Sequence, residues 1–147
     1  MTSDNLDSAI LLSVTSHIGT IDENGEPFIL HPIHIMMKMS SIEEKIVAIL
    51  HDIVEDTSIT LLTIEKQFGI VVRDAIDAIS RRKGEDYNNY IKRVKENSLA
   101  TKVKLVDLRH NMDILRTQDL QDYKLKRLKK YHKAYMYLSG QCQILEG

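Results

Sequence analysis

The stretch from Ile42 to Thr57 places the strongest constraint on the fold of this 147-residue chain. Its first part is an apolar run with the spacing of a buried helix face. The members of this run are Ile42, Ile46, Val47, Ile49, Leu50 and Ile53. Ser41, followed three residues later by Glu44, is typical of a capping box and predicts where the helix begins.

The same stretch ends in side chains that can bind metals or move protons, namely His51, Asp52, Glu55 and Asp56. On a continuing helix, His51 would face Glu55 and Asp52 would face Asp56, because residues four apart are neighbours. Carboxylates gathered against an apolar run repel one another and lose hydration. A divalent cation would remove this cost, so the stretch predicts a metal site. A helix that ends in a solvated acidic loop is the alternative.

The rest of the apolar pattern predicts an all-α protein, a compact multi-helix bundle around this central site. Two prolines and an aromatic content of 5% accompany repeated i, i+3, i+4 apolar spacing. The expected helices cover residues 3–17, a segment around Pro32, and residues 42–53, 61–68, 70–79, 87–94, 99–110 and 123–138. Ser3 or Asp4 is expected to cap the first helix, Ser98 a later one, and Gly140 to end the last.

Two helices have predicted packing faces. These faces consist of Ile10, Leu11, Val14 and His17 in the first helix, and of Ile33, Met36, Met37 and Met39 in the second. Both sets follow the spacing of one side of a helix.

Composition limits the classes of protein to which this chain can belong. With 43% hydrophobic and 28% charged residues, the chain is expected to form one globular domain over residues 1–147. The longest aliphatic run, Ile46 to Leu50, is too short to cross a bilayer, and no secretory signal opens the chain. Cys142 is the single cysteine and cannot form an internal disulfide. These features predict a cytoplasmic protein without a membrane partner.

The net charge of −1 hides an asymmetry. Residues 1–72 carry eleven acidic and three basic side chains, a net charge of −8, whereas residues 73–147 carry ten acidic and seventeen basic ones, a net charge of +7. An acidic half that binds a cation beside a basic half would suit an anionic substrate. Solvated helix faces would give the same distribution.

Four residues are candidates for one metal site: His31, His51, Asp52 and Asp107. Two imidazole nitrogens and two carboxylates suit Mn²⁺, Fe²⁺ or Zn²⁺ better than Mg²⁺. The spacing excludes the common zincin motif, because no second histidine follows His51 four residues later.

Glu55 and Asp56 are the candidate proton-transfer residues, and Asn111 is a candidate ribose or phosphate contact because it lies one turn beyond Asp107. The alternative for Glu55 and Asp56 is an acidic, solvated surface, and the alternative for Asn111 is a helix cap.

Arg81, Arg82 and Lys83 could neutralise a polyphosphate, although charge runs are often only solvated. A denser basic run is interpreted as surface spread around the last helix, so a nucleic-acid partner is not expected. This run consists of Lys124, Lys126, Arg127, Lys129, Lys130 and Lys133. His34 and His110 are expected in the core or in a pocket wall, without a ligand role.

Four segments stand in a characteristic order: Gly25–Pro32 with its HP pair, His51–Thr57 with HDxxED, Tyr87–Val94, and Val103–Met112 with KLxDxxHN. Together they resemble the HD-domain phosphohydrolases, and within them the hydrolase domain of the RelA/SpoT family of alarmone enzymes. The resemblance covers about residues 8–116, and the expected C-terminal helix, residues 122–140, lies beyond it.

The resemblance implies an HD-type helical bundle that removes pyrophosphate from the 3′ position of guanosine tetra- or pentaphosphate, (p)ppGpp. The residues that would hold Mn²⁺ are His31, His51, Asp52 and Asp107. Glu55 and Asp56 match the family's catalytic acidic pair, and Asn111 matches its nucleotide-contacting asparagine. The chain would then be a small, hydrolase-only alarmone enzyme of the kind found in metazoans and bacteria.

Two departures from the family pattern concern nucleotide recognition, because Ile18 and Asp113 stand where family members often carry basic residues. Alternatives are therefore another HD-type activity, such as a nucleotidase or an NADPH phosphatase, or a catalytically silent alarmone-binding module. A homodimer is left open, and the family suggests an alarmone-synthesising toxin as a cognate partner.

Overall fold

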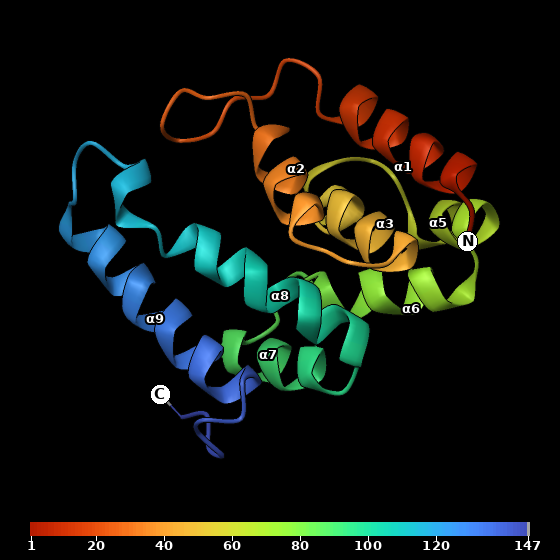
Figure 1. Cartoon of the computed structure of the whole chain (residues 1–147). Helices are drawn as coiled ribbons and strands as arrows, with labels where there is room; N and C mark the ends of the chain where they lie inside the picture. The colour runs from red at the N-terminus through yellow and green to blue at the C-terminus, as the bar shows by residue number, and fades with distance from the viewer. Residues whose placement is uncertain (147) are drawn as a thin grey trace.

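The computed structural model describes residues 1–146, and over this range helices joined by loops are the regular secondary structure, apart from one isolated bridge between Ile21 and Pro27. Its elements are α1 (Ser3–Ser16), α2 (Leu30–Met37), α3 (Ile42–Leu50), α4 (Ile53–Asp56), α5 (Leu61–Phe68), α6 (Ile70–Ile79), α7 (Tyr87–Lys95), α8 (Ser98–Asn111), the 3₁₀ turn η1 (Ile114–Arg116) and α9 (Asp122–Leu138). The predicted all-α class is confirmed (Figure 1).

Helix α3 is the centre of the fold. All five residues from Ile46 to Leu50 are buried, and α1, α2, α6 and α8 pack around the helix (Figure 1). A helix that is apolar on every side must be enclosed in this way. The predicted capping box also forms: the Glu44 N–H donates to Ser41 Oγ at 3.1 Å, and the Ser41 N–H donates to Glu44 Oε2 at 3.2 Å.

The expectation that this helix continues past His51 is wrong. Helix α3 ends at Leu50, His51 and Asp52 form a turn, and the short α4 begins at Ile53. The His51 imidazole bonds to the carbonyl of Ala48 at 2.7 Å, and the His51 N–H reaches the same carbonyl at 3.4 Å. Because the backbone turns here, His51 and Asp52 are both directed at one centre instead of at partners four residues away.

Two helices are capped by a residue one or two positions before the expected N-cap. Thr2, not Ser3 or Asp4, caps α1, in a capping box with Asn5. Asn97 caps α8 instead of Ser98, with its Oδ1 accepting from the Ala100 N–H at 2.8 Å. In both cases the observed cap has a side-chain oxygen that can accept a hydrogen bond, and its backbone is extended, as is typical of an N-cap.

The end of the last helix was predicted correctly. Gly140 follows the end of α9 with a φ of +80°, a conformation in which a residue with a Cβ would be strained.

Two predicted packing faces are partly wrong. In α1, Leu11 and Val14 are exposed whereas Ser13 is buried. In α2, Met37 is exposed and Ile35 is fully buried. Both helices lie against α3, and the position of α3 decides which side of each faces inward.

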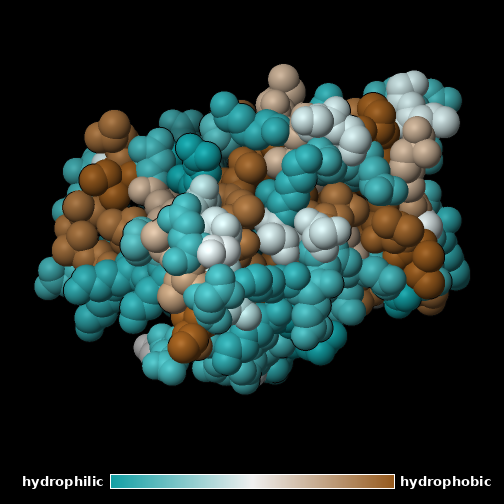
Figure 2. Space-filling view, turned by 60° about the horizontal axis from the view of Figure 1, so that its bottom comes forward, coloured by the Kyte–Doolittle hydropathy of each residue, from teal (hydrophilic) through white to brown (hydrophobic). Residues whose placement is uncertain are grey.

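The second half of the chain builds the other wall of the molecule. Helices α7, α8 and α9 contact one another, and α9 lies on the far side of α8 from α1 (Figure 1). The face seen in Figure 2 is largely hydrophilic, with apolar side chains at both sides and in part of its middle. No helix within residues 1–146 combines the length and the apolar character that crossing a membrane requires.

Candidate functional site

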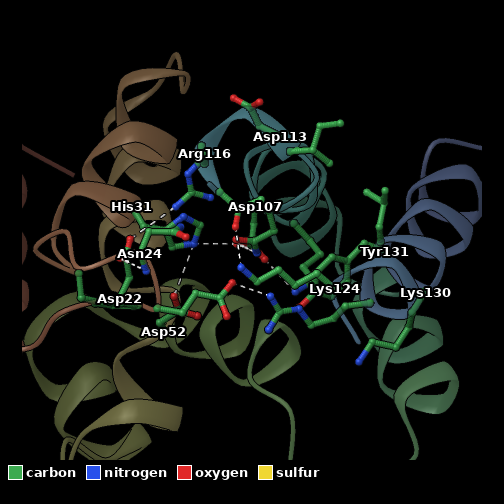
Figure 3. A pocket seen from close by; sticks show the side chains of 18 of the residues that line it. Asp22, Asn24, His31, Asp52, Asp107, Asp113, Arg116, Lys124, Lys130 and Tyr131 are labelled. Carbon is green, nitrogen blue, oxygen red and sulfur yellow. Dashed lines mark hydrogen bonds and ion pairs between the residues drawn. The ribbon is translucent and has the colours of Figure 1, made fainter. Parts of the chain in front are cut away.

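Four candidate ligands from three separate segments meet beside α3. His31 comes from α2, His51 and Asp52 from the turn before α4, and Asp107 from α8. The His31 Nε2 atom lies 2.9 Å from Asp107 Oδ1 and 3.8 Å from Asp52 Oδ2 (Figure 3). The His51 Nε2 atom lies 3.0 Å from Asp52 Oδ2 and 3.5 Å from Asp107 Oδ1. Ligand atoms of His31, His51 and Asp52 all lie within 4.8 Å of one another.

Both histidines turn Nε2 toward this cluster. The Nδ1 atom of His51 bonds to the Ala48 carbonyl at 2.7 Å, and Nδ1 of His31 lies 2.7 Å from Nδ1 of His110. The Nε2 atom of His51 is buried and, over the described part of the chain, finds no partner in hydrogen-bonding geometry. Asp52 is near this atom but is not aligned for a hydrogen bond. An imidazole held by one nitrogen and open at the other is arranged to bind a metal ion, so the cluster fits a divalent cation.

The carboxylates of the cluster are held in their charged form. Burial raises the pKa of Asp107, but the Lys104 ammonium at 2.8 Å and the nearby imidazoles outweigh it and hold that pKa well below its usual range. Burial likewise raises the pKa of Asp52, and His51 outweighs it. Ionised carboxylate oxygens next to imidazole nitrogens form a mixed donor set typical of transition-metal sites.

Lys104 and Asn111 support Asp107 from the same helix. Lys104 donates to Asp107 Oδ2, and the Asn111 side-chain amide donates to Oδ1 at 3.0 Å. These residues lie three and four positions from Asp107, so they share its side of α8. Lys104 was not predicted, although its place in KLxDxxHN was a signal that could have found it.

The predicted acidic pair lies at the edge of the cluster, on α4. Glu55 lines the main cavity and accepts a hydrogen bond from the backbone N–H of Arg81. Asp56 faces a neighbouring surface recess that Glu55 also lines. Burial and the negative charge of Asp52 raise the pKa of Asp56 to about 6, and burial raises the pKa of Glu55. A carboxyl group that titrates near neutral pH can exchange a proton with a reacting group.

A cavity of about 370 Å³ opens from the cluster toward α9. Its size lies in the range of small-molecule sites. Cationic side chains line it at Arg81, Lys104, Arg116, Lys124, Arg127 and Lys130. Aromatic rings line it at Phe28, Tyr87, Tyr90 and Tyr131. Figure 3 shows Lys124 and Tyr131 of α9 across the cavity from His31 and Asp107. One end is therefore suited to a metal and the other to an anion.

The predicted basic loop is divided between two surfaces. Arg81 lines the main cavity together with Asn111, and their roles as substrate contacts stay predictions. Arg82 and Lys83 line only the recess beside Asp56. Arg82 also lies 3.5 Å from Asp77, so part of its charge is already compensated.

The interpretation of the basic run in the last helix as surface is wrong for three of its members. Lys124, Arg127 and Lys130 stand three residues apart and share the face of α9 that lines the cavity. Lys126 and Lys129 are exposed between them. The three-residue spacing was visible in the sequence, but the sequence does not indicate what that face packs against.

His34 and His110 lie beside the cluster, but both are half-buried and neither lines the cavity or the recess, so their expected place in the core or in a pocket wall is wrong. The His110 ring stacks on His31 at 5.0 Å and on His34 at 3.9 Å between ring centres. Burial, reinforced by the nearby Arg116, lowers the pKa of His110 to about 4. A neutral His110 can share one hydrogen with His31, which fixes the orientation of that imidazole.

Comparison with known proteins places this geometry in context. No protein-family model matches the chain. A guanosine-3′,5′-bis(diphosphate) 3′-pyrophosphohydrolase of Borreliella burgdorferi is 29% identical over 124 residues, 73% of this chain and 18% of the relative. The bifunctional (p)ppGpp synthase/hydrolase SpoT of Escherichia coli is 27% identical over 75% of this chain and 18% of its own. A putative chloroplastic GTP diphosphokinase, RSH1 of Arabidopsis thaliana, is 34% identical over 71% and 14%.

The chain thus spans less than a fifth of the length of each of these relatives. A solved structure of a metazoan orthologue of SpoT that hydrolyses ppGpp matches with a TM-score of 0.79. This match covers 95% of the present chain and 88% of the other at 21% identity, and it establishes the fold. The order of the motifs, the sequence relatives and the fold agree, and the resemblance of this chain to the RelA/SpoT-type hydrolase domain is confirmed.

Proposed function

We propose that this protein is a metal-dependent phosphohydrolase that removes pyrophosphate from the 3′ position of (p)ppGpp. One observation carries the proposal: ligand-type side chains from α2, the α3–α4 turn and α8 converge at one end of a cavity whose other end is cationic. Relatives named as 3′-pyrophosphohydrolases of this nucleotide support the choice of substrate.

In this proposal His31, His51, Asp52 and Asp107 hold Mn²⁺, with Fe²⁺ and Zn²⁺ as the alternatives that their nitrogen and oxygen donors also suit. The unpartnered Nε2 of His51 supports a bound cation. Such an ion supplies Lewis acidity, which polarises phosphate oxygens and makes water a better nucleophile.

The residues of the chain then handle protons and charge. Asp56, with a pKa of about 6, accepts a proton from the attacking water near neutral pH. Glu55 is fixed by the Arg81 N–H and orients that water. Arg82 and Lys83 lie in the recess beside Asp56, where they attract the departing pyrophosphate.

The opposite end of the cavity positions the nucleotide. The cations of α9 and Arg81 face the phosphates, and the rings of Phe28 and Tyr131 offer flat surfaces for a base. Asn111 donates one amide hydrogen to Asp107 and keeps its carbonyl oxygen for a ribose hydroxyl.

The test is product analysis by chromatography after incubation of the purified protein with Mn²⁺ and ppGpp. We expect release of pyrophosphate, and a loss of more than about 100-fold in rate for Asp52→Ala, because a ligand to the metal is removed. Asp7→Ala, which removes an exposed acid of α1, is the matched control and should retain the rate. Equal activity of the Asp52→Ala protein and the parent would refute the assignment.

A different nucleotide is the second candidate, favoured by Asp113, which puts negative charge on the cavity wall where family members often carry a basic residue. NADPH and ordinary nucleotides therefore belong in the same assay. Tight binding of ppGpp without turnover would indicate a silent binding module instead.

The exposed, unpaired thiol of Cys142 supports a reducing compartment such as the cytoplasm. A homodimer and a toxin partner stay predictions.

A further inference from the structure

The cationic face of α9 is nearly uncompensated. Among residues 1–146, Glu23 is the one acidic side chain within 4.0 Å of Lys124, Arg127 or Lys130, and it contacts Arg127 with 2.5 Å between Oε1 and the guanidinium. Within the described part of the chain, the Lys124 ammonium donates hydrogen bonds only to the Thr117 hydroxyl and to the backbone carbonyl of Asp119. The wall that faces the cavity therefore carries more positive charge than its neighbours neutralise.

Lys130 shows the consequence of this excess. Its ammonium lies 4.5 Å from the centre of the Tyr87 ring and 5.5 Å from that of Tyr131, with no carboxylate partner in the described range. Burial and the positive charges of Arg81, Arg127 and Lys104 lower the pKa of Lys130. A dianionic group entering here would relieve a repulsion that already exists.

Glu23 reaches this wall from a turn that is held by its own hydrogen bonds. The Asp22 carboxylate accepts from the Asn24 N–H at 2.8 Å and from the Glu26 N–H at 3.0 Å. The Asp22 N–H donates to the Glu26 carbonyl at 2.8 Å. Gly25, with a φ of +83°, completes the turn. The turn thus needs no contact with Arg127, and the Glu23 side chain can leave Arg127 without unfolding it.

The ion pair itself is weak. The side chains of Arg127 and Glu23 are 36% and 44% exposed, and pairs this accessible to water contribute little. A phosphate can instead make two parallel charge-assisted hydrogen bonds to one guanidinium, a stronger arrangement than a single carboxylate oxygen provides.

We propose that Glu23 is a displaceable internal anion, which occupies Arg127 at the α9 end of the cavity until a phosphate group of the ligand replaces it. Glu23 is then a specificity-determining residue. A ligand must carry enough negative charge at this end to outcompete a carboxylate, so polyphosphorylated ligands are favoured over neutral or singly charged ones. The proposal rests on the proposed function for its anionic ligand, but its test needs no turnover.

The experiment is isothermal titration of the metal-free protein with inorganic pyrophosphate. Glu23→Gln should bind pyrophosphate about two- to fivefold more tightly than the parent, because an exposed ion pair no longer competes. Glu26→Gln removes the same charge from an exposed position of the same turn and should bind like the parent. In an Arg127→Gln background, Glu23→Gln should give no gain.

Equal affinities of Glu23→Gln and Glu26→Gln would overturn the proposal, as would an undiminished gain in the Arg127→Gln background or no measurable pyrophosphate binding to any of the proteins. Loss of ppGpp hydrolysis is scored separately. An inactive protein that shows the Glu23 effect refutes the proposed function and leaves this inference standing.

Discussion

At the scale of single residues, the site depends on which atoms remain free. The Nδ1 atom of His51 bonds to the Ala48 carbonyl of α3 and its Nε2 atom faces the cluster, so the ring cannot rotate without losing that bond. Asp107 is buried and receives Lys104, Asn111 and His31 together. Under the proposed function, these fixed orientations hold the metal ligands in place in advance, which lowers the entropy cost of ordering them on binding.

Asp56 gives a prediction at this scale. Its pKa is about 6 in the folded protein, above the ordinary 3.8, so its ionisation opposes folding. The contribution to stability is fully present below pH 3.8 and is lost as pH rises through 6. Asp56→Asn should therefore raise the free energy of unfolding at pH 7.5, by roughly 0.5–1 kcal/mol because water screens this exposed group, and by almost nothing at pH 3.5.

Urea denaturation of the metal-free protein at the two pH values measures this difference. Asp7→Asn, at an exposed site of α1, serves as the control. A stabilisation that persists unchanged at pH 3.5 would show that the charge of Asp56 is not its cause. Under the proposed function the same substitution lowers turnover by about 10²- to 10⁴-fold.

At the scale of elements, local signals in the sequence predicted most helices. The Ser41–Glu44 capping box and the bounds of α5 and α6 agree with the structure, since they depend on side chains a few residues apart. The break after Leu50 could not be predicted, because no pattern in the sequence indicates the bond between the His51 ring and the Ala48 carbonyl that accompanies it. The inward sides of α1 and α9 could not be predicted either, because helical spacing identifies a face but not its neighbour.

Helix α9 allows a prediction in which one double variant is the control for another. Lys124→Gln with Lys130→Gln removes two cations from the cavity wall, whereas Lys126→Gln with Lys129→Gln removes two from the exposed side of the same helix. The net charge is the same in both proteins. We expect the first pair to raise the KM for ppGpp by about tenfold or more, since charge-assisted contacts to phosphate are lost, and the second to change it little.

Steady-state kinetics at two salt concentrations measure both proteins. The effect of the cavity pair should shrink as salt rises, because screening already weakens the contacts in the parent. Matching KM values for the two double variants would mean that α9 attracts the nucleotide only through its total charge.

At the scale of the whole molecule, the candidate ligands connect α2, the turn after α3, and α8. His31 and Asp107 are 76 positions apart, so no spacing rule joins them. Their grouping was predictable only from the order of the motifs. The cationic end of the cavity was not predictable, because it forms where α9 folds back beside α8.

A ligand that joins distant segments must stabilise the fold as a whole. We expect Mn²⁺ to raise the melting temperature of the metal-free protein, with a gain of about 2.7 kcal/mol at a metal concentration one hundred times the dissociation constant. His51→Ala should remove this gain, and Mg²⁺, which prefers oxygen donors, should give a smaller one. Differential scanning calorimetry with and without each metal measures these melting temperatures. If Mn²⁺ raised the melting temperature of the His51→Ala protein as much as that of the parent, the ion would bind at another site.

The spread of the ligands along the chain also has a consequence during synthesis. On a translating ribosome His31, His51 and Asp52 emerge first, and the cluster cannot close until Asp107 and the rest of α8 have followed. The positively charged wall of α9 emerges later still. Under the proposed function, a nascent chain would therefore complete its metal-binding cluster before the wall that contacts the nucleotide.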